Sequence, residues 1–273
     1  MEQSERLDYL LAGLLKEDQK YADIRIPEDI SEKQRLLRSL FNLRLPGTAD
    51  PELLQVQNEY LKQRNREKGI VAAADIETIA QQGSDHPFAD ILALYQGDIT
   101  TIACDAIMNA ANSQMLGCFV PLHNCIDNCI HTYAGMQLRN ECFRQMQDLR
   151  RLYGEDYEQP TAKPLISKAY NLPCRYVIHV VGPIVQGPLK AQDRQDLYDC
   201  YENVMSLAQE KDIRTLAFCC LSTGVFGFPQ AEATKTAVKA CLDYLNRHPY
   251  QFDKLIFNVF RDEDLYLYQQ VLF

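Results

Sequence analysis

Apolar residues in the first part of the chain recur every three or four positions, which is the spacing of one face of an α-helix. Leu7, Leu10, Leu11 and Leu14 carry this pattern near the start. The pattern predicts that residues 1 to about 85 are helical. This region contains no cysteine, no histidine and no glycine-rich loop. We therefore interpret it as a helical extension, residues 1–87, that packs against the rest of the chain or faces a partner.

From residue 88 onward, short apolar runs alternate with longer helical patterns. The predicted strands are residues 91–97, 106–111, 164–170, 176–182, 215–221 and 254–260. The predicted helices are residues 127–150, 194–210, 230–247 and 263–272. The strand runs are almost continuously apolar, which is typical of a sheet that helices cover on both faces. The pattern favours an α/β layered fold for residues 88–273, with ligand-binding loops at the carboxyl ends of the strands.

Composition and charge narrow the possible functions. The 273 residues are 47% hydrophobic and carry a formal net charge of −9. The densest basic stretch, LKQRNREKG at residues 61–69, lies in a helical pattern and is interpreted as a solvated helix face. Because no basic patch is visible, a nucleic-acid partner is not expected. An anionic ligand would have to be held by backbone N–H groups and helix dipoles.

The cysteines and the first residues indicate where the protein works. Several of the ten cysteines, such as Cys219, Cys220 and Cys241, lie inside apolar runs, which is typical of buried free thiols. The first 20 residues mix acids and bases and do not resemble a secretory signal. No run approaches the roughly 20 apolar residues of a membrane span. We therefore expect a cytoplasmic protein that does not enter a membrane.

Two loops that follow predicted strands have the composition of ligand-binding turns. In QGDIT, residues 96–100, Gly97 allows a tight turn and Asp98 could accept from an amine such as that of adenine. In STGVFGF, residues 222–228, small residues between a strand and a helix could cradle a phosphate. This loop lacks the G-K-[ST] of a P-loop. A simple turn remains the alternative for each loop when it is considered alone.

A third loop contains an unusual concentration of possible metal ligands. The stretch GCFVPLHNCIDNCIH, residues 117–131, holds three cysteines and two histidines. It follows NAANSQML, in which Asn109 and Asn112 stand at the end of a predicted strand. A helix is predicted to begin at Ile126. The residue types suggest a metal site with more candidate ligands than a tetrahedral ion can use.

The motifs QGDIT, CDAIMNAANSQML, IDNCIHTYAG and LSTGVFGFP together resemble the macrodomain family, which binds ADP-ribose. They fall in the family's order and cover roughly residues 88–261. The resemblance implies a three-layer fold with a mixed, mostly parallel central sheet flanked by helices. Most macrodomains have a glycine-rich loop where this chain has residues 118–125. That difference is similar to the zinc-dependent branch of the family, whose members are protein ADP-ribosylhydrolases often paired with a sirtuin-type ADP-ribosyltransferase. A helical N-terminal extension also fits that branch.

The resemblance assigns roles residue by residue. Asp98 and the backbone of Ile99 match the adenine contacts. Asn112 matches the residue that bonds the distal ribose, and Asp127 matches the acidic residue beside it, so both are predicted to be catalytic. The other predicted ADP-ribose contacts are Ile126, Ser222, Thr223, Gly224, Val225 and Phe226. The residues that match the zinc ligands are Cys118, His123 and Cys125. Three further residues lie near the family's site and could be only structural: Asn109, Phe228 and Asn258.

Helix geometry also sorts the five metal-ligand candidates. Cys118, His123 and Cys125 precede the predicted helix, whereas Cys129 and His131 lie inside it, about 200° apart around its axis. Three loop ligands with an open fourth position are the arrangement of a catalytic zinc. The alternatives are a structural site closed by Cys129, or no metal. Cys129 is expected in the core, and His131, like His179, is expected to be a hydrogen-bonded structural histidine.

The leading hypothesis is a zinc-dependent hydrolase that removes mono-ADP-ribose from acidic side chains of a modified protein. Zinc would activate water or polarise the ribose and acyl oxygens, and Asp127 would orient the water or hold a ribose hydroxyl. Three alternatives remain. They are a non-catalytic ADP-ribose reader, an O-acetyl-ADP-ribose deacetylase, and a zinc-dependent nucleic-acid-binding module, which the net charge disfavours.

Overall fold

The computed structural model describes residues 1–273 and contains a six-stranded sheet with the order β2-β8-β7-β4-β6-β5. Its strands are β2 (Leu92–Gln96), β4 (Ala106–Ala111), β5 (Leu165–Lys168), β6 (Tyr176–Val181), β7 (Thr215–Phe218) and β8 (Lys254–Val259). All neighbouring strands are parallel except β5, which pairs antiparallel with β6 at one edge. The mixed, mostly parallel sheet and all six strand predictions are confirmed.

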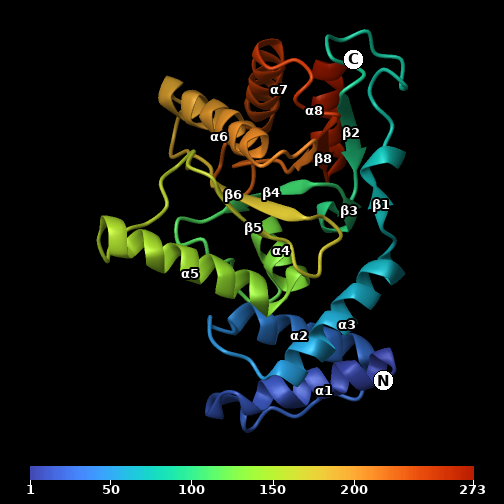
Figure 1. The fold of residues 1–273 in the computed structure, drawn as a ribbon, viewed down its shortest axis with the longest axis vertical. Helices are drawn as coiled ribbons and strands as arrows, with labels where there is room; N and C mark the ends of the chain where they lie inside the picture. Colours follow the sequence, from blue (N-terminus) through green and yellow to red (C-terminus); the bar gives the residue numbers. More distant parts are fainter.

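Helices cover both faces of this sheet, as the apolar strands predict. On one face lie α4 (Ile126–Ala134) and α5 (Met136–Tyr153), and on the other lie α6 (Ala191–Glu210), α7 (Gln230–Arg247) and α8 (Asp262–Leu272) (Figure 1). Four of the strands, β4, β6, β7 and β8, are buried at all but one of their residues. The main hydrophobic core therefore lies on both sides of the sheet, and the three-layer fold is confirmed.

The single helix predicted at 127–150 is wrong, because the chain breaks it at Gly135. This glycine has a φ of +93°, a left-handed conformation that residues with a Cβ rarely adopt. A Cβ at this position would also meet the side-chain amides of Gln57 and Asn171. The break separates α4, which directly follows the loop of the candidate metal ligands Cys118, His123 and Cys125, from the longer α5.

The N-terminal region forms three helices with a hydrophobic core of their own. These are α1 (Gln3–Lys16), α2 (Ile30–Leu43) and α3 (Pro51–Lys68), and they lie beyond α4 and α5, on the side away from the sheet (Figure 1). The prediction of helix to about residue 85 is wrong. The helices end at Lys68, and a short strand, β1 (Val71–Ala72), then pairs with β3 (Ile102–Ala103). The proposed division at residue 87 stays a prediction, but the apolar residues already join the main core from Ala73 onward.

Buried polar contacts join the helical extension to the main domain. The fully buried Gln57 of α3 accepts from the backbone N–H of Met136, the first residue of α5. Asn65 of α3 donates to the carbonyl of Asn171. The buried Arg139 of α5 donates to the carbonyls of Phe41, Asn42 and Arg44 at the end of α2. Because unpaired buried polar groups are costly, these bonds hold the extension in one orientation.

None of the helices combines the length and the apolar character that crossing a membrane requires.

Candidate active site

The predicted binding loops gather at one edge of the sheet. The strands β2, β8, β7 and β4 are neighbours and run parallel. Their carboxyl ends therefore lead into the loops that carry Asp98, Phe260, residues 222–228 and Asn112 on the same side of the sheet. This is the position at which open α/β sheets bind ligands.

Asp98 caps a short 3₁₀ helix, Ile99–Thr101, directly after β2. One carboxylate oxygen accepts from the backbone N–H of Thr100 at 2.9 Å and from its hydroxyl at 2.6 Å. The other oxygen pairs with Lys68, the last residue of α3. Burial opposes ionisation here, but the hydrogen bonds from Lys68 and Thr100 lower the pKa of Asp98. Asp98 is therefore an ionised acceptor at neutral pH, and an incoming amine would share it with Lys68.

Two residues at the end of β8, Asn258 and Phe260, lie near the loop that carries Asp98. The side chain of Asn258 donates to the carbonyls of Tyr95 and Gly97, so it holds the end of β2. Phe260 follows β8 with 77% of its surface exposed, and Gln96 donates to its carbonyl. No pattern in the sequence distinguishes Phe260. Only its exposure in the structure is unusual. A flat, exposed aromatic ring beside an acceptor carboxylate can stack on a purine base.

The loop after β7 presents a row of free backbone donors. The backbone N–H groups of Thr223, Gly224, Val225 and Phe226 donate to no other atom of the protein. Two backbone hydrogen bonds close the loop. The N–H of Gly227 donates to the Gly224 carbonyl, and the N–H of Phe228 donates to the Ser222 carbonyl. Ser222 is buried and has a φ of +64°, whereas Val225 is 82% exposed. Consecutive free N–H groups just before the start of α7 form a cradle for an anion such as a pyrophosphate.

Asn109, Asn112 and Asp127 form a hydrogen-bonded group between β4 and α4. Asp127, the second residue of α4, is 4% exposed. One of its oxygens accepts from Asn109 at 2.8 Å and the other from Asn112 at 3.3 Å. Burial raises the pKa of Asp127 to about 6, against the stabilising bond from Asn109. The carboxylate is therefore ionised at neutral pH but lies close to its protonation range.

The structure brings together the three loop residues that the sequence singles out as metal ligands. The donor atoms of Cys118, His123 and Cys125 all lie within 4.8 Å of one another, and all three side chains are partly exposed. The Cys118 sulfur is 3.7 Å from Nδ1 of His123. Thiolate and imidazole ligands of a tetrahedral zinc are about 3.6 Å apart, given bonds of about 2.3 and 2.05 Å. The donor set and its spacing fit zinc.

Cys125 also occupies a favourable position for a thiolate. It is the N-cap of α4, and its sulfur accepts from the backbone N–H of Asn128 at 3.4 Å. Burial raises the pKa of the Cys125 thiol to about 12. A coordinating divalent cation reverses this balance, since it deprotonates a thiol that binds it. The confirmed helix start at Ile126 leaves the N–H groups of the first turn directed toward this loop.

Two neighbouring side chains differ from their predicted environments. Cys129 is not in the core. It is half-buried and its sulfur lies 3.7 Å from Nη2 of Arg38 in α2. His131 is buried as predicted, but neither ring nitrogen has a hydrogen-bond partner, so a hydrogen-bonded histidine is wrong for this position. Its ring instead lies against Gly117, where a Cβ would collide with it.

A second group of metal-binding residue types lies in the core. The donor atoms of His131, Cys142 and His179 are also within 4.8 Å of one another, and all three residues are buried. His179 contacts Asn109 through Nδ1 at 3.0 Å and Ser167 through Nε2 at 2.9 Å, so a hydrogen-bonded structural role is confirmed for it. Cys142 lies 3.7 Å from Nε2 of His179.

The extension packs against the main domain, and three of its residues also contact the candidate site. Lys68 pairs with Asp98, and Arg38 and Asn42 of α2 form hydrogen bonds with the backbone of residues 122–123. The interpretation of residues 61–69 as a solvated helix face is partly wrong, because Asn65 is buried and Arg64 lies over the ring of Tyr133. No local pattern marks these residues, because their partners are distant in the sequence.

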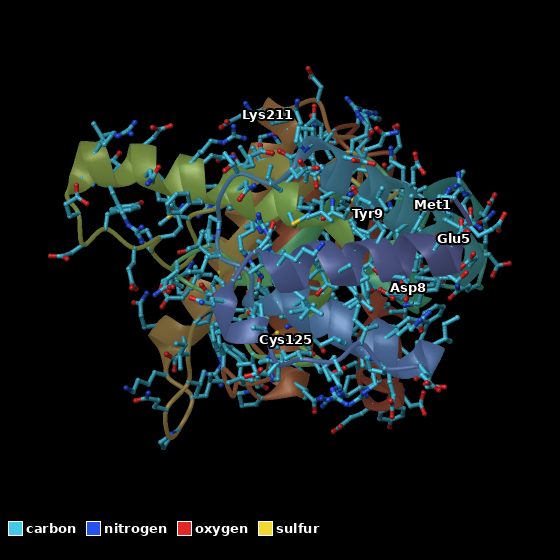
Figure 2. All side chains as sticks on the ribbon, turned by 90° about the horizontal axis from the view of Figure 1, so that it is seen from below. Met1, Glu5, Asp8, Tyr9, Cys125 and Lys211 are labelled. Carbon is cyan, nitrogen blue, oxygen red and sulfur yellow. The ribbon has the colours of Figure 1, made fainter.

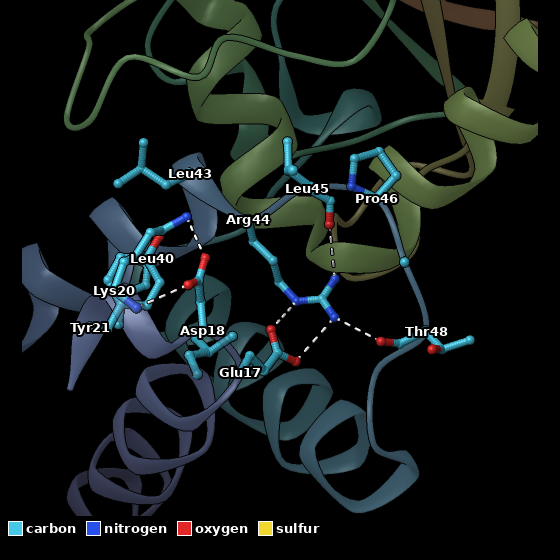
Figure 3. Close-up of a pocket in the computed structure, with 12 residues that line it drawn as sticks. Glu17, Asp18, Lys20, Tyr21, Leu40, Leu43, Arg44, Leu45, Pro46 and Thr48 are labelled. Carbon is cyan, nitrogen blue, oxygen red and sulfur yellow. Dashed lines mark hydrogen bonds and ion pairs between the residues drawn. The ribbon is translucent and has the colours of Figure 1, made fainter.

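A cavity of about 320 Å³ lies within the extension, away from these loops (Figure 3). Charged side chains line it, but they are paired with one another. Arg44 donates to both carboxylate oxygens of Glu17 and to the carbonyl of Thr48, and Lys20 pairs with Asp18. The cavity therefore lacks free groups for a ligand, and the loops at the sheet edge remain the candidate site.

Comparisons with known proteins identify the family of this chain. The Macro domain family profile matches residues 108–237. A protein-ADP-ribose hydrolase of Treponema medium is 42% identical and aligns over the whole of both chains. One from Staphylococcus aureus strain MRSA252 is 37% identical over 97% of this chain and 94% of its own.

Solved macrodomain structures have a similar fold. A Trypanosoma brucei macrodomain in complex with ADP-ribose superposes with a TM-score of 0.65 at 25% identity, covering 90% of this chain and 97% of that one. An Oceanobacillus iheyensis macrodomain with ADP superposes with a TM-score of 0.58 at 32% identity, covering 68% and 92% of the two chains.

Proposed function

The chain belongs to the macrodomain family, alongside protein-ADP-ribose hydrolases, and from this premise we propose that it is a zinc-dependent hydrolase that removes mono-ADP-ribose from acidic side chains of proteins. The observation that carries the proposal is the position of the three donor atoms. Cys118, His123 and Cys125 meet on the loop that joins the Asn112 turn to the helix bearing Asp127. A protein that only binds ADP-ribose would not need such a cluster at this point.

In the proposed complex, the two halves of ADP-ribose are held by different loops. Asp98 accepts from the adenine amine, and Phe260 stacks on the base. The four free N–H groups of residues 223–226 bind the pyrophosphate, which the net charge of −9 would otherwise repel. These two anchors direct the distal ribose toward Asn112 and Asp127, and anchoring of this kind supplies much of the orientation that hydrolysis requires.

Asp127 and Asn112 would act on the distal ribose. With a pKa of about 6, Asp127 is an ionised hydrogen-bond acceptor at neutral pH, suited to a ribose hydroxyl or to water. Its bond from Asn112 fixes the direction of that amide, which also donates to the Gly117 carbonyl. Zinc bound to Cys118, His123 and Cys125 would supply a Lewis acid or a water with a lowered pKa beside these groups.

The direct test is release of ADP-ribose from a protein modified on glutamate, followed by mass spectrometry, with zinc content measured on the same sample. We expect zinc-dependent release by the parent chain. Asp127→Ala should lower the rate by about 10²–10⁴-fold, which is the usual contribution of a general acid or base. Binding of free ADP-ribose should change much less, because residues 223–226 and Asp98 are intact.

The same experiment separates the alternatives. Tight ADP-ribose binding by the parent without any release would identify a reader and refute the hydrolase. Release that persists unchanged after complete removal of metal would refute zinc dependence. Release from a serine-linked substrate but not from a glutamate-linked one would refute the proposed linkage while leaving the hydrolase.

A further inference from the structure

The loop that carries the three donor atoms is held from outside the macrodomain, by the second helix of the extension. Arg38 of α2 donates through Nη2 to the backbone carbonyl of His123 at 2.7 Å. The same nitrogen contacts the side-chain oxygen of Asn128 at 3.1 Å. One turn further along α2, Asn42 accepts from the backbone N–H of Leu122 at 3.0 Å. Cys125, labelled in the view from below, is the N-cap of α4, and α4 is in contact with α2 (Figure 2).

These contacts act where the loop is strained. Leu122 has a φ of +58°, a conformation that costs energy for any residue with a Cβ, and it directly precedes His123. Such residues persist only where surrounding contacts favour them over relaxed alternatives. The bond from the Leu122 N–H to Asn42 is a contact of this kind. Asn42 itself is buried and also donates to Thr132 of α4 at 2.8 Å.

Arg38 further organises the rest of the loop through Asn128. The amide nitrogen of Asn128 donates to the carbonyls of Cys118 and Val120, at 3.2 and 3.0 Å. Arg38 bonds the oxygen of the same amide and so fixes which way it faces. The backbones of Cys118 and His123, two of the three proposed ligands, are thus bound to one buried asparagine and one arginine.

The end of α2 is itself anchored. Arg139 of α5 donates to three of its final carbonyls and also to the carbonyl of Leu116, just before the loop. A positive charge at the C-terminus of a helix is favourable. The position of Arg38 relative to the loop is therefore set by the docking of the whole helix, not by a flexible tether.

We propose that α2 of the N-terminal extension is part of the metal site, with Arg38 and Asn42 as positioning residues that hold the loop in its ligand-presenting conformation. The inference rests on the proposed function in that the loop is taken to bind zinc. It goes further in assigning the extension a role in the site rather than in packing alone.

The test compares single variants of the full chain. Arg38→Met keeps an apolar stem but removes the donors, and Arg38→Lys keeps one compact charge. Arg6→Ala is the matched control, since Arg6 belongs to the extension but pairs with Glu59, joining α1 to α3. Zinc affinity is measured by competition with a chelator, and the spectrum of bound Co²⁺ reports the geometry of the donors.

We expect Arg38→Met to weaken zinc binding by about 10–100-fold, as loss of a supporting partner typically does. Arg38→Lys should recover part of that loss. Arg6→Ala should change the zinc affinity by less than about fivefold. The partly exposed pair of Arg6 with Glu59 joins α1 to α3, and such ion pairs contribute little to stability. Equal zinc affinity and an unchanged Co²⁺ spectrum in Arg38→Met and the parent would overturn the proposal.

Hydrogen exchange of the peptide covering residues 117–125 tests, without any metal, whether α2 holds this loop. In metal-free protein, Arg38→Met should speed exchange of this loop while the β-sheet stays protected, and Arg6→Ala should not. A parent chain that binds no zinc would refute the proposed function, but the exchange result would still decide whether α2 holds the loop. Identical loop exchange in all three chains would overturn the positioning role.

Discussion

Two clusters of cysteine and histidine involve α4, one on the loop before it and one that includes its residue His131, and they differ in burial and in hydrogen bonding. The loop cluster, Cys118, His123 and Cys125, is partly exposed and its donor atoms have few other partners. The core cluster, His131, Cys142 and His179, is buried. Both have donor atoms at a spacing that could suit a metal. Residue type and spacing therefore do not by themselves define a metal site.

The groups around each cluster decide whether its donor atoms are free to bind a metal. In the core cluster, both nitrogens of His179 already contact Asn109 and Ser167. Burial raises the pKa of the Cys142 thiol far above its ordinary value and lowers that of His179 to about 3, so the neutral forms prevail. The core cluster supports Asn109 and, through it, Asp127. The loop cluster is open to solvent and to a metal. Four predictions test this contrast.

Removal of a ligand from the loop cluster should have the largest effect. Cys118→Ala should weaken zinc binding by more than about 100-fold, because loss of a direct ligand costs more than loss of a residue that supports a ligand. The rate of hydrolysis should fall with the zinc content. Cys142→Ala in the core cluster should keep its zinc. Metal analysis after dialysis against a weak chelator measures both. Zinc retention by Cys118→Ala, or zinc loss in folded Cys142→Ala, would reverse the assignment of the two clusters.

Removal of a core histidine should chiefly affect stability. His179→Ala leaves a cavity and deprives Asn109 and Ser167 of a partner, so the free energy of unfolding should fall by about 3 kcal/mol or more. His123→Ala in metal-free protein should change it by less than about 1 kcal/mol. Urea unfolding in the presence of a chelator gives both values. Similar losses for the two variants would contradict the contrast.

The core cluster should also make stability depend on pH. Burial lowers the pKa of His179 to about 3 from an ordinary value of 6.5. Below pH 6.5 the unfolded chain binds a proton at this histidine that the folded protein does not bind. The free energy of unfolding therefore decreases as the pH is lowered from about 6.5 to about 3. Between pH 7.5 and 5 the loss from His179 alone should be about 2 kcal/mol.

Urea unfolding of metal-free protein at these two pH values measures this loss. His179→Gln, which has no titrating ring, is the control and should show a smaller decrease. A decrease of the same size in both chains would show that other groups cause it.

The smallest effect is expected at Cys129, which lies between Cys125 and His131 in the sequence and belongs to neither cluster. Cys129→Ala removes only a half-buried thiol beside Arg38, so stability should change by less than about 1 kcal/mol. Zinc stoichiometry should stay at the parent value. A loss of zinc in this variant would indicate that Cys129 closes a structural site, which is the alternative that the sequence leaves open.

Local sequence patterns predicted most of the fold. The six apolar runs correspond to the six strands, and the start of α4 at Ile126 was visible from the loop that precedes it. The helix predicted at 127–150 was wrong because its pattern continues through Gly135, and one glycine is tolerated in many helices. Only the contact of Gly135 with Gln57 and Asn171, together with its positive φ, shows why the chain turns there.

The candidate site shows the same division. The spacing of Cys118, His123 and Cys125 before a helix was enough to propose the ligand set, because ligands on one short loop can meet without help from distant parts of the chain. The free N–H groups of residues 223–226 likewise follow from a short loop between a strand and a helix. In contrast, the exposure of Phe260 and the unpartnered nitrogens of His131 depend on what packs around them.

The sequence by itself determined most of the elements, the order of the loops and the residues able to bind a metal and an anion, since each depends on neighbours within a few positions. Only the tertiary structure decided which Cys and His cluster is open, and that the extension reaches the site. Arg38 and His123 are 85 positions apart, and Lys68 and Asp98 are 30 apart. Such pairs meet because buried side chains such as Gln57 and Arg139 fix the docking of the helices, and no local pattern encodes that orientation.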